Sequence, residues 1–425
     1  MSSTQIAAAT PRKDDVTVTH AKFFGWRVTW AAFTVAIFAW GISFYGPPVF
    51  LHAVHESRGW PIWLISTAVT CHYLCGAFLV ANLPALHRRL GVGGTTRLGG
   101  VLTGLGVVGW ALAQAPWQLF AATLVSGAGW AMTGAAAINA MVAPWFVRRR
   151  PAALSTAYNG ASVGGILFTP LWVLLIAAWG FAGAAIAVGL TMAVTLSVLA
   201  GRFLSASPER LGQQPDGDAP AAVAARPASP HAPLPGRSLW RNRRFLTLVA
   251  GSALGLFAQI GLIAHLFSLL VAPMGTQLAG FAAGLATVCA IIGRSLLGVL
   301  LSSGRDRRIA AALNAAIQVA GSFALLASGG TDVALLLTGI VLFGLGLGNA
   351  ASVPAMIAQS DFSPADTARV VALVTACSQA AYAFAPAAFG VLREISAGPQ
   401  TLFLAAAAIQ AASALVMLAG RQPSR

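Results

Sequence analysis

The sequence predicts an all-α integral membrane protein with twelve transmembrane helices, arranged in two six-helix, pseudo-symmetric bundles. Hydrophobic residues make up 57% of the 425-residue chain and charged residues only 9%, well below the roughly 25% that a soluble protein carries. Apolar runs long enough to cross a bilayer, about 20 residues each, recur along the whole chain. The basic residues fall in short clusters between these runs.

The apolar runs can be followed in order from the N-terminus. Residues 1–22 are polar and are expected to form a cytoplasmic tail. The stretches 98–147 and 151–201 hold no charged residue and are each long enough for two helices, with breaks at Ala115-Pro116 and Trp179-Gly180. The remaining spans are expected at 28–51, 61–86, 245–271, 278–301, 309–327, 333–358, 370–392 and 401–420.

A change in composition divides the chain into two halves. Residues 205–242 hold seven prolines and predict a flexible cytoplasmic linker. We therefore expect an N-terminal six-helix bundle at 23–204, a C-terminal six-helix bundle at 243–420 and a short tail at 421–425. Similar stretches, 153–157 with 372–376 and 127–129 with 344–346, lie 219 and 217 positions apart. This shared offset favours an internal repeat of six helices.

The Lys and Arg residues gather on one side of the expected membrane. Of the 26, 23 lie in the tails and one alternate set of loops, whereas Arg58 and Arg393 lie in the opposite set. Loops rich in Lys and Arg stay in the cytoplasm, so both termini and the linker are expected there, in a multi-pass protein of the inner (plasma) membrane. The net charge of +15 does not indicate nucleic-acid binding, because it is not gathered on one basic face.

One basic residue, Arg294, lies deep inside an expected span. It precedes Arg305 by eleven residues, roughly 16 Å along a helix, so its side chain does not reach the cytoplasmic surface. All 11 Asp and Glu lie in tails, loops or span ends. An ionisable residue inside a span is by default functional, and a substrate carboxylate would pair with this one through two parallel hydrogen bonds. The alternative is an arginine that ties helices together by bonding to backbone carbonyls.

Other polar residues inside the spans are candidates for contact with a substrate or a proton. His72 and His265 are suited to carry a proton or to bond the substrate. The alternative for each is a neutral histidine bonded to a neighbouring helix, and much of the remaining set is expected to form such interhelical bonds. The remaining candidates are Tyr45, Tyr158, Asn159, Gln259, Asn349, Gln379 and Tyr382.

Several short motifs carry a family resemblance. They are Phe24-Gly25-Trp26, Gly59-Trp60, the aromatic and basic run at 145–162, the Pro-Glu-Arg run at 208–217, and Gly293-Arg294 with Gly298. Together they resemble the major facilitator superfamily, and more narrowly its monocarboxylate porter and oxalate/formate antiporter groups. The resemblance implies a central substrate cavity lined by spans 1, 7 and 11, which favours Tyr45, Gln259 and Gln379. It also implies cytoplasmic gating loops that contain Arg88, Arg89, Arg148, Arg149, Arg150, Asp306 and Arg307.

Two departures from the family pattern bear on coupling. Monocarboxylate porters often carry an Asp one turn before the span-8 arginine, where this chain has Ala290. The loop motif at 82–91 keeps its basic cluster but lacks an acid. Protons are the candidate coupling ion, and they would have to travel on His72, on His265 or on the substrate itself; otherwise the protein is a uniporter or an exchanger.

These observations predict a secondary active transporter that moves a small organic anion, a monocarboxylate, by alternating access. One alternative is an efflux pump for hydrophobic or drug-like compounds on the same fold, and another, of a different class, is a non-transporting membrane sensor. No enzyme activity, cofactor or metal site is expected, because the sequence has no nucleotide-binding motif and its four Cys lie inside apolar runs. We expect a monomer.

Overall fold

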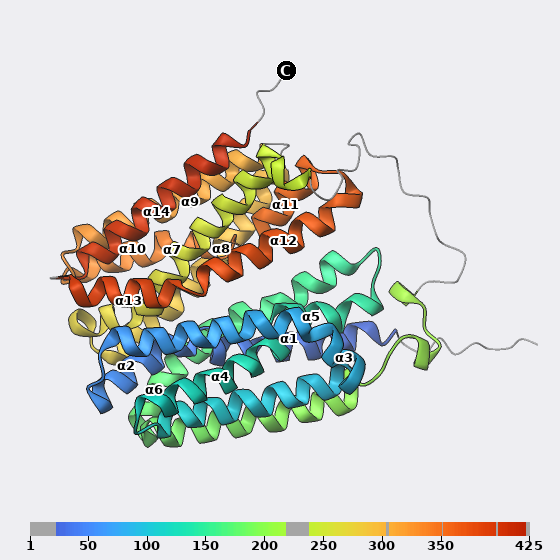
Figure 1. Ribbon diagram of the computed structural model, residues 1–425, viewed down its shortest axis with the longest axis horizontal. Helices are drawn as coiled ribbons and strands as arrows, with labels where there is room; N and C mark the ends of the chain where they lie inside the picture. The colour runs from blue at the N-terminus through green and yellow to red at the C-terminus, as the bar shows by residue number, and fades with distance from the viewer. Residues whose placement is uncertain (1–22, 218–237, 303–305, 351, 397, 422–425) are drawn as a thin grey trace, which may run out of the picture.

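The structure, a computed structural model, describes residues 23–217, 238–302, 306–350, 352–396 and 398–421. They fold into helices that form two bundles lying alongside each other, one blue to green and the other yellow to red (Figure 1). The predicted tail at 1–22, the middle of the predicted linker at 218–237 and residues 422–425 lie outside the described residues.

Each bundle contains long helices and also short helices that form one part of a broken span. The N-terminal bundle holds α1 (Gly25–Ser43), α2 (Gly46–Arg58), α3 (Ile62–Leu112), α4 (Pro116–Thr133), α5 (Ala135–Val142) and α6 (Arg150–Leu199). The C-terminal bundle holds α7 (Arg243–Met274), α8 (Thr276–Ser302), α9 (Arg307–Ala327), α10 (Val333–Leu347), α11 (Ser352–Asp361), α12 (Pro364–Tyr382), α13 (Ala385–Ile395) and α14 (Gln400–Ala419).

The lengths of these helices give twelve spans. Within the described residues, nine stretches are long and apolar enough to cross a membrane, and the bent pair of α10 and α11 makes a tenth. Two of the nine, Ile62–Leu112 and Ala152–Leu204, contain 51 and 53 residues, or roughly 75 Å of helix, more than twice a bilayer core. They are broken at Gly91 (φ 71°) and Gly180 (φ 70°), where a side chain would strain the backbone. Each therefore counts as two spans, in agreement with the sequence prediction.

Four spans are interrupted near their middle, which the apolar runs alone did not predict. Span 1 is broken between α1 and α2, and Pro47 and Pro48 lie directly after the break. Proline has no N–H group and its ring crowds the preceding turn, so a straight helix cannot pass through it. Span 11 breaks before Pro386, span 10 before Pro354, and span 4 at Gly134. Such breaks leave backbone polar groups without helical partners in the middle of the protein.

Glycines set the close approach of helices within each bundle. A Cβ on Gly106 of α3 would lie 2.5 Å from the backbone nitrogen of Ser126 in α4. In the C-terminal bundle, a Cβ on Gly344 would lie 2.6 Å from the carbonyl oxygen of Ala286. Small residues allow helix backbones to pack at short range in a membrane, where packing rather than water exclusion drives helix association.

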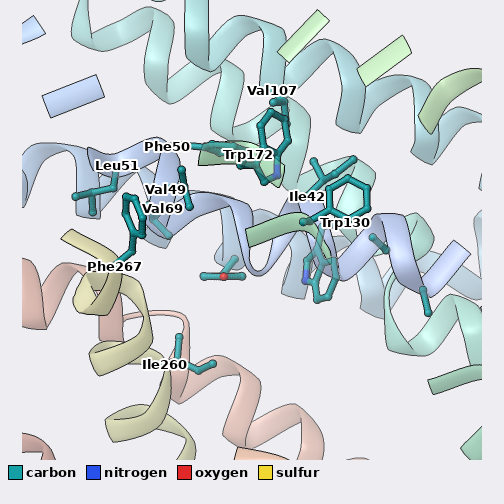
Figure 2. Packing of buried hydrophobic residues seen from close by; sticks show 14 of the residues in the cluster. Ile42, Val49, Phe50, Leu51, Val69, Val107, Trp130, Trp172, Ile260 and Phe267 are labelled. Atoms are coloured by element: carbon teal, nitrogen blue, oxygen red, sulfur yellow. The ribbon is translucent and has the colours of Figure 1, made fainter. Parts of the chain in front are cut away.

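The two ends of the molecule differ in how the bundles meet. We call the end that carries residues 205–217 and 238–242 the linker end, and the opposite one the far end. At the far end, the backbone N–H of Ala387 donates to Thr70 Oγ1 at 3.1 Å, across the two bundles. Phe267 of α7 points toward Leu51 and Val69 of the N-terminal bundle (Figure 2).

The hydrophobic clusters show the same asymmetry. One cluster of buried side chains runs through both bundles and includes Trp172 of α6 and Phe267 of α7. A second cluster, around Phe245, Ile357 and Phe362, belongs to the C-terminal bundle alone and lies at the linker end. Among the described residues the bundles therefore share an apolar core toward the far end and not at the linker end.

Candidate functional site

Arg294 lies half-buried in α8 and reaches the break of span 10. Its Nε donates a hydrogen bond of 2.8 Å to the carbonyl oxygen of Gly348. α8 passes very close to this segment, because a Cβ on Gly348 would collide with the carbonyl oxygen of Ala290. The bond to a carbonyl is the contact expected of a helix-tying arginine, but it uses only one of the donors. Among the described residues, Nη1 and Nη2 have no hydrogen-bond partner.

Two asparagines hold the segment that accepts the Arg294 bond. Asn349 is buried, and its Nδ2 donates to Asn314 Oδ1 at 2.7 Å. Asn314 Nδ2 in turn donates to the carbonyl oxygen of Gly346 at 3.2 Å. Because backbone groups freed by a helix break need partners in a membrane, these amides stabilise the break. Asn349 thus lies beside the Arg294 anchor, and its position favours the interhelical alternative.

Tyr45 lies at the break of span 1 and faces the other bundle. A Cβ built on Gly165 of α6 would lie 2.6 Å from Tyr45 Cε2 and 2.8 Å from Thr287 Oγ1 of α8. Three helices from both bundles therefore meet at this point. Arg294 follows Thr287 by seven residues in α8 and therefore lies on the same side of that helix as the contact with Tyr45. The structure thus brings together these two residues predicted from the sequence.

The two predicted proton carriers lie inside separate bundles. His72 is buried, with Nδ1 2.8 Å from Ser126 Oγ, which also accepts from Trp110 Nε1 at 3.3 Å. His265 is buried in the other bundle, with Nε2 3.1 Å from the carbonyl oxygen of Pro386. Because a carbonyl only accepts, Nε2 must carry the proton there; Nδ1 has no partner within the described part of the chain. Both contacts match the interhelical alternative, and a proton-carrying role stays a prediction.

The remaining predicted residues differ in their contacts and burial. Tyr158 is half-buried and its hydroxyl donates to the carbonyl oxygen of Ala135 at 2.9 Å. Tyr382 lies at the end of α12, with its ring 5.9 Å from that of Tyr73 in the other bundle. Asn159 is exposed, Gln379 is half-buried and Gln259 is buried.

The basic loop of the N-terminal bundle is held by the start of the linker. Asp216 accepts hydrogen bonds from the backbone N–H groups of Val147, Arg148 and Arg149 at 2.8–3.1 Å. Burial opposes ionisation of this carboxyl, but these backbone donors and the charge of Arg148 hold its pKa below the usual value. Gln213 accepts from the backbone N–H of Phe24 at 2.9 Å.

This segment, 209–217, therefore differs from the flexible chain expected for the linker. It forms two short 3-10 turns, and its side chains of Gln213 and Asp216 accept hydrogen bonds from the backbone N–H groups of Phe24 and of residues 147–149, which directly precede α1 and α6. Backbone N–H groups that leave water need such acceptors. The remaining residues predicted for the N-terminal gating loop lie nearby: Arg88 and Arg89 are exposed, and Arg150 donates to the carbonyl oxygens of Phe146 and Ala143.

The basic loop of the C-terminal bundle is organised around acidic residues. Asp306 caps α9 by accepting from the backbone N–H of Arg308 at 2.8 Å, and it pairs with Arg421 at 2.7 Å. Burial opposes ionisation, but these hydrogen bonds hold the pKa of Asp306 below its usual value. Arg307 donates to the carbonyl oxygen of Met356. Whether these contacts gate transport stays a prediction.

Sequence reasoning missed three residues near the centre: Thr287, Tyr73 and Asn314. None of the three is charged or belongs to a recognisable motif. The only available signal was indirect: Thr287 lies seven residues before Arg294, and therefore on the same helical face. It also missed that Arg308 is buried and paired with Asp361 at 2.8 Å.

Comparison with known proteins identifies relatives by sequence. The family described as the Major Facilitator Superfamily matches residues 117–386. Monocarboxylate transporter 11 from Mus musculus is 33% identical over 172 residues, which cover 40% of this chain and 35% of that protein. The human protein of the same name is 34% identical over 172 residues, covering 40% and 33%. The match thus spans about a third of the length of these curated relatives.

Comparison with solved structures identifies the fold. The nucleoside transporter NupG superposes with a TM-score of 0.72 at 12% identity, covering 93% of this chain and 98% of that one. A D-xylose-proton symporter gives 0.68 at 13% identity, with 93% and 97% covered. At such identities the likeness concerns the fold alone. Together with the family match over more than half of the chain, it confirms the predicted architecture: this protein belongs to the major facilitator superfamily and is a multi-pass membrane transporter, not an enzyme.

Proposed function

We propose that this transporter carries a small organic anion, a monocarboxylate, between the two bundles by alternating access. The observation that supports the proposal is Arg294, a half-buried guanidinium in the middle of a span. Its Nε is fixed by Gly348, and its Nη1 and Nη2 have no partner among the described residues. A planar guanidinium that is fixed at Nε is suited to bind a carboxylate through Nη1 and Nη2.

The charges around Arg294 favour a substrate with one carboxylate rather than two. Among the described residues, Arg294 has neither an acidic partner nor a full set of backbone acceptors, whereas Arg393, another half-buried arginine of a span, lies toward the far end and donates to Ser268 Oγ. A bound monocarboxylate would neutralise it, and the neutral pair would disturb a low-dielectric interior less than a bare charge. The likeness of part of the chain to monocarboxylate transporter 11 is consistent with this.

The test is uptake of labelled monocarboxylates into proteoliposomes. We expect Arg294→Ala to lose uptake and Arg294→Lys to retain only weak uptake, because lysine keeps the charge but lacks the planar fork. Arg243→Ala, an exposed arginine of the same bundle, serves as the matched control and should transport normally. Uptake by Arg294→Ala equal to that of the wild type would overturn the proposal.

Coupling to protons is the second part of the proposal. No described span carries an acid at its centre, so His72 and His265, each with one ring nitrogen that has no partner among the described residues, are the candidate carriers, unless the proton travels on the substrate itself. We expect His265→Gln to abolish accumulation driven by a pH gradient while exchange of substrate continues. If single and double substitutions of His72 and His265 leave the accumulation unchanged, the histidines carry no coupling proton.

We also propose that the linker end faces the cytoplasm of the inner membrane. The support is the concentration of Lys and Arg in the loops of that end. A cysteine introduced at the exposed Arg210 should react with an impermeant maleimide only from the cytoplasmic side, and one at the exposed Ser57 only from outside. Labelling of both from one side would contradict this orientation.

A further inference from the structure

A connected series of aromatic rings runs through the N-terminal bundle. Trp40 lies 6.3 Å from Tyr158 and 4.9 Å from Trp130, measured between ring centroids. Phe44 lies 6.4 Å from Trp130 and 6.5 Å from Tyr73. All of these spacings are within or near the range in which aromatic rings attract each other. The rings come from spans 1, 2, 4 and 5, so the series belongs to the bundle rather than to one helix.

This aromatic series extends to the surface between the bundles. Tyr45 lies 5.0 Å from Phe44, and Tyr73 lies 5.9 Å from Tyr382 of the C-terminal bundle. Trp130 and Tyr73 are buried and serve the packing of the bundle. The other members, Trp40, Phe44, Tyr45, Tyr158 and Tyr382, remain half-buried. All four tyrosines of the chain belong to this series.

Helix geometry places one of these rings opposite Arg294. Gly165 of α6 and Thr287 of α8 meet at the centre, where a Cβ on Gly165 would lie 2.8 Å from Thr287 Oγ1. α6 runs from the linker end toward this contact, and α8 runs from it back toward the linker end. Tyr158 precedes Gly165 by seven residues and Arg294 follows Thr287 by seven.

Both side chains therefore lie on the facing sides of their helices, because seven residues make nearly two full turns. Each is displaced from the central contact by roughly 10 Å toward the linker end. At that level the bundles no longer share a hydrophobic cluster among the described residues. The register thus places Tyr158 and Arg294 on the interface sides of α6 and α8, at the level where the bundles separate.

We propose that the transported anion is an aromatic monocarboxylate, in which an aryl ring lies one or two bonds from the carboxylate. The inference rests on the proposed function of Arg294 and adds the nature of the rest of the substrate. The carboxylate would bind Arg294 on one bundle, while its ring would pack against Tyr158 and Trp40 on the other. Such a molecule contacts both bundles at once, which a small aliphatic acid would not.

The local structure supports a ring-binding role for Tyr158. Its hydroxyl donates to the carbonyl oxygen of Ala135, which fixes the orientation of the ring before a ligand arrives. A ring held in advance loses little freedom on binding, so its packing contributes to affinity. Stacked or edge-on ring pairs are more favourable than their buried area alone predicts.

The experiment measures binding of three acids to the purified protein by thermal shift and by displacement of a labelled acid. Phenylacetate carries the aromatic ring, cyclohexylacetate matches it in size without being flat, and propionate lacks a ring. We expect phenylacetate to bind about 3- to 10-fold more tightly than cyclohexylacetate. Tyr158→Leu should remove this preference, whereas Tyr158→Phe, which keeps the ring but loses the bond that orients it, should retain part of it.

A control variant separates binding from packing. Phe50→Leu removes a buried ring that packs on Trp110 and Trp172, away from Arg294, and should lower stability without changing the preference. Equal affinity for phenylacetate and cyclohexylacetate, or a preference that survives in Tyr158→Leu, would overturn the aromatic inference while the monocarboxylate proposal stands. If none of the acids binds and Arg294→Ala behaves like the wild type, both proposals fail.

Discussion

Arg294 and Arg308 lie in consecutive helices, and both are withdrawn from solvent, yet their surroundings are opposite. Arg308 is 3% exposed and donates to Asp361 Oδ2 at 2.8 Å, to Thr247 Oγ1 at 3.1 Å and to the carbonyl oxygens of Met417 and Arg244 at 3.2 and 2.8 Å. Arg294 makes one such bond. A guanidinium has five N–H donors. Arg308 thus has acceptors for nearly all of its donors, whereas most donors of Arg294 have none among the described residues.

This difference indicates that depth alone does not identify a functional arginine. The acceptors of Arg308 come from α7, α11 and α14, so its charge ties three helices together at the linker end. The donors of Arg294 that have no partner among the described residues are available to bind a ligand. The two residues therefore predict different consequences when their charge is removed.

The largest effect is expected for Arg308→Ala. Removing one partner of a buried ion pair leaves the other charge unsatisfied and typically lowers stability by about 3–5 kcal/mol. We expect a clear fall in the melting temperature of the protein in detergent, with loss of uptake as a result of unfolding. If the variant is as stable as the wild type, Arg308 does not stabilise the fold and the contrast with Arg294 fails.

An intermediate effect, on binding rather than on folding, is expected for Arg294→Ala. Hydrogen bonds to a charged group contribute about 1.5–3 kcal/mol, so the affinity for a carboxylate should fall roughly 10- to 100-fold. Stability should change by less than about 1 kcal/mol, since no acidic partner is left behind. Both quantities can be measured in one thermal titration with and without the acid. Unfolding of this variant would make Arg294 a second structural arginine.

The smallest effect is expected for Asp216→Asn in segment 209–217, which binds the residues just before α1 and α6. The carboxylate accepts three backbone hydrogen bonds, and the amide keeps a weaker acceptor, so we expect a loss of about 1 kcal/mol at neutral pH. Because the pKa of Asp216 is lowered in the folded protein, its contribution is present above the ordinary carboxyl pKa and is lost as the pH falls through the lowered value.

Melting temperatures of both proteins between pH 3 and pH 7 would show whether this holds. Asp332→Asn is the control, because Asp332 is an exposed N-cap of α10 and asparagine caps a helix about as well. The stability difference between wild type and Asp216→Asn should shrink toward the acidic end. A difference that stays constant over this interval would mean that ionisation of Asp216 is not what holds the segment.

The sequence predicted the spans because their signal is local. The break at Trp179-Gly180 follows from the length of one uncharged run, and the structure has a turn with positive φ at Gly180. The helix interruptions were not predicted, although Pro47 and Pro48 are present in the sequence, because the length of an apolar run does not indicate whether its helix is continuous. The fold was therefore predictable to the level of spans and bundles.

The candidate site was predictable only in part. Arg294 was identified because a charge in an apolar run is rare. The surroundings of His72 and His265 were not, because a helix that is apolar on all sides gives no indication of which face meets another helix and which meets lipid. The pairing of Arg308 with Asp361, 53 positions away, likewise depends on tertiary packing that no local pattern records.

The apolar contacts at the far end have a consequence for how the protein responds to temperature. To open that end, the bundles must expose side chains such as Phe267 and Val173 that are now buried. Exposure of apolar surface raises the heat capacity, so the free energy of opening must curve with temperature. Because hydrophobic contacts weaken on cooling, the closure at the far end becomes less favourable in the cold. At constant substrate and pH, cooling should therefore shift the population of molecules toward the state that is open at the far end.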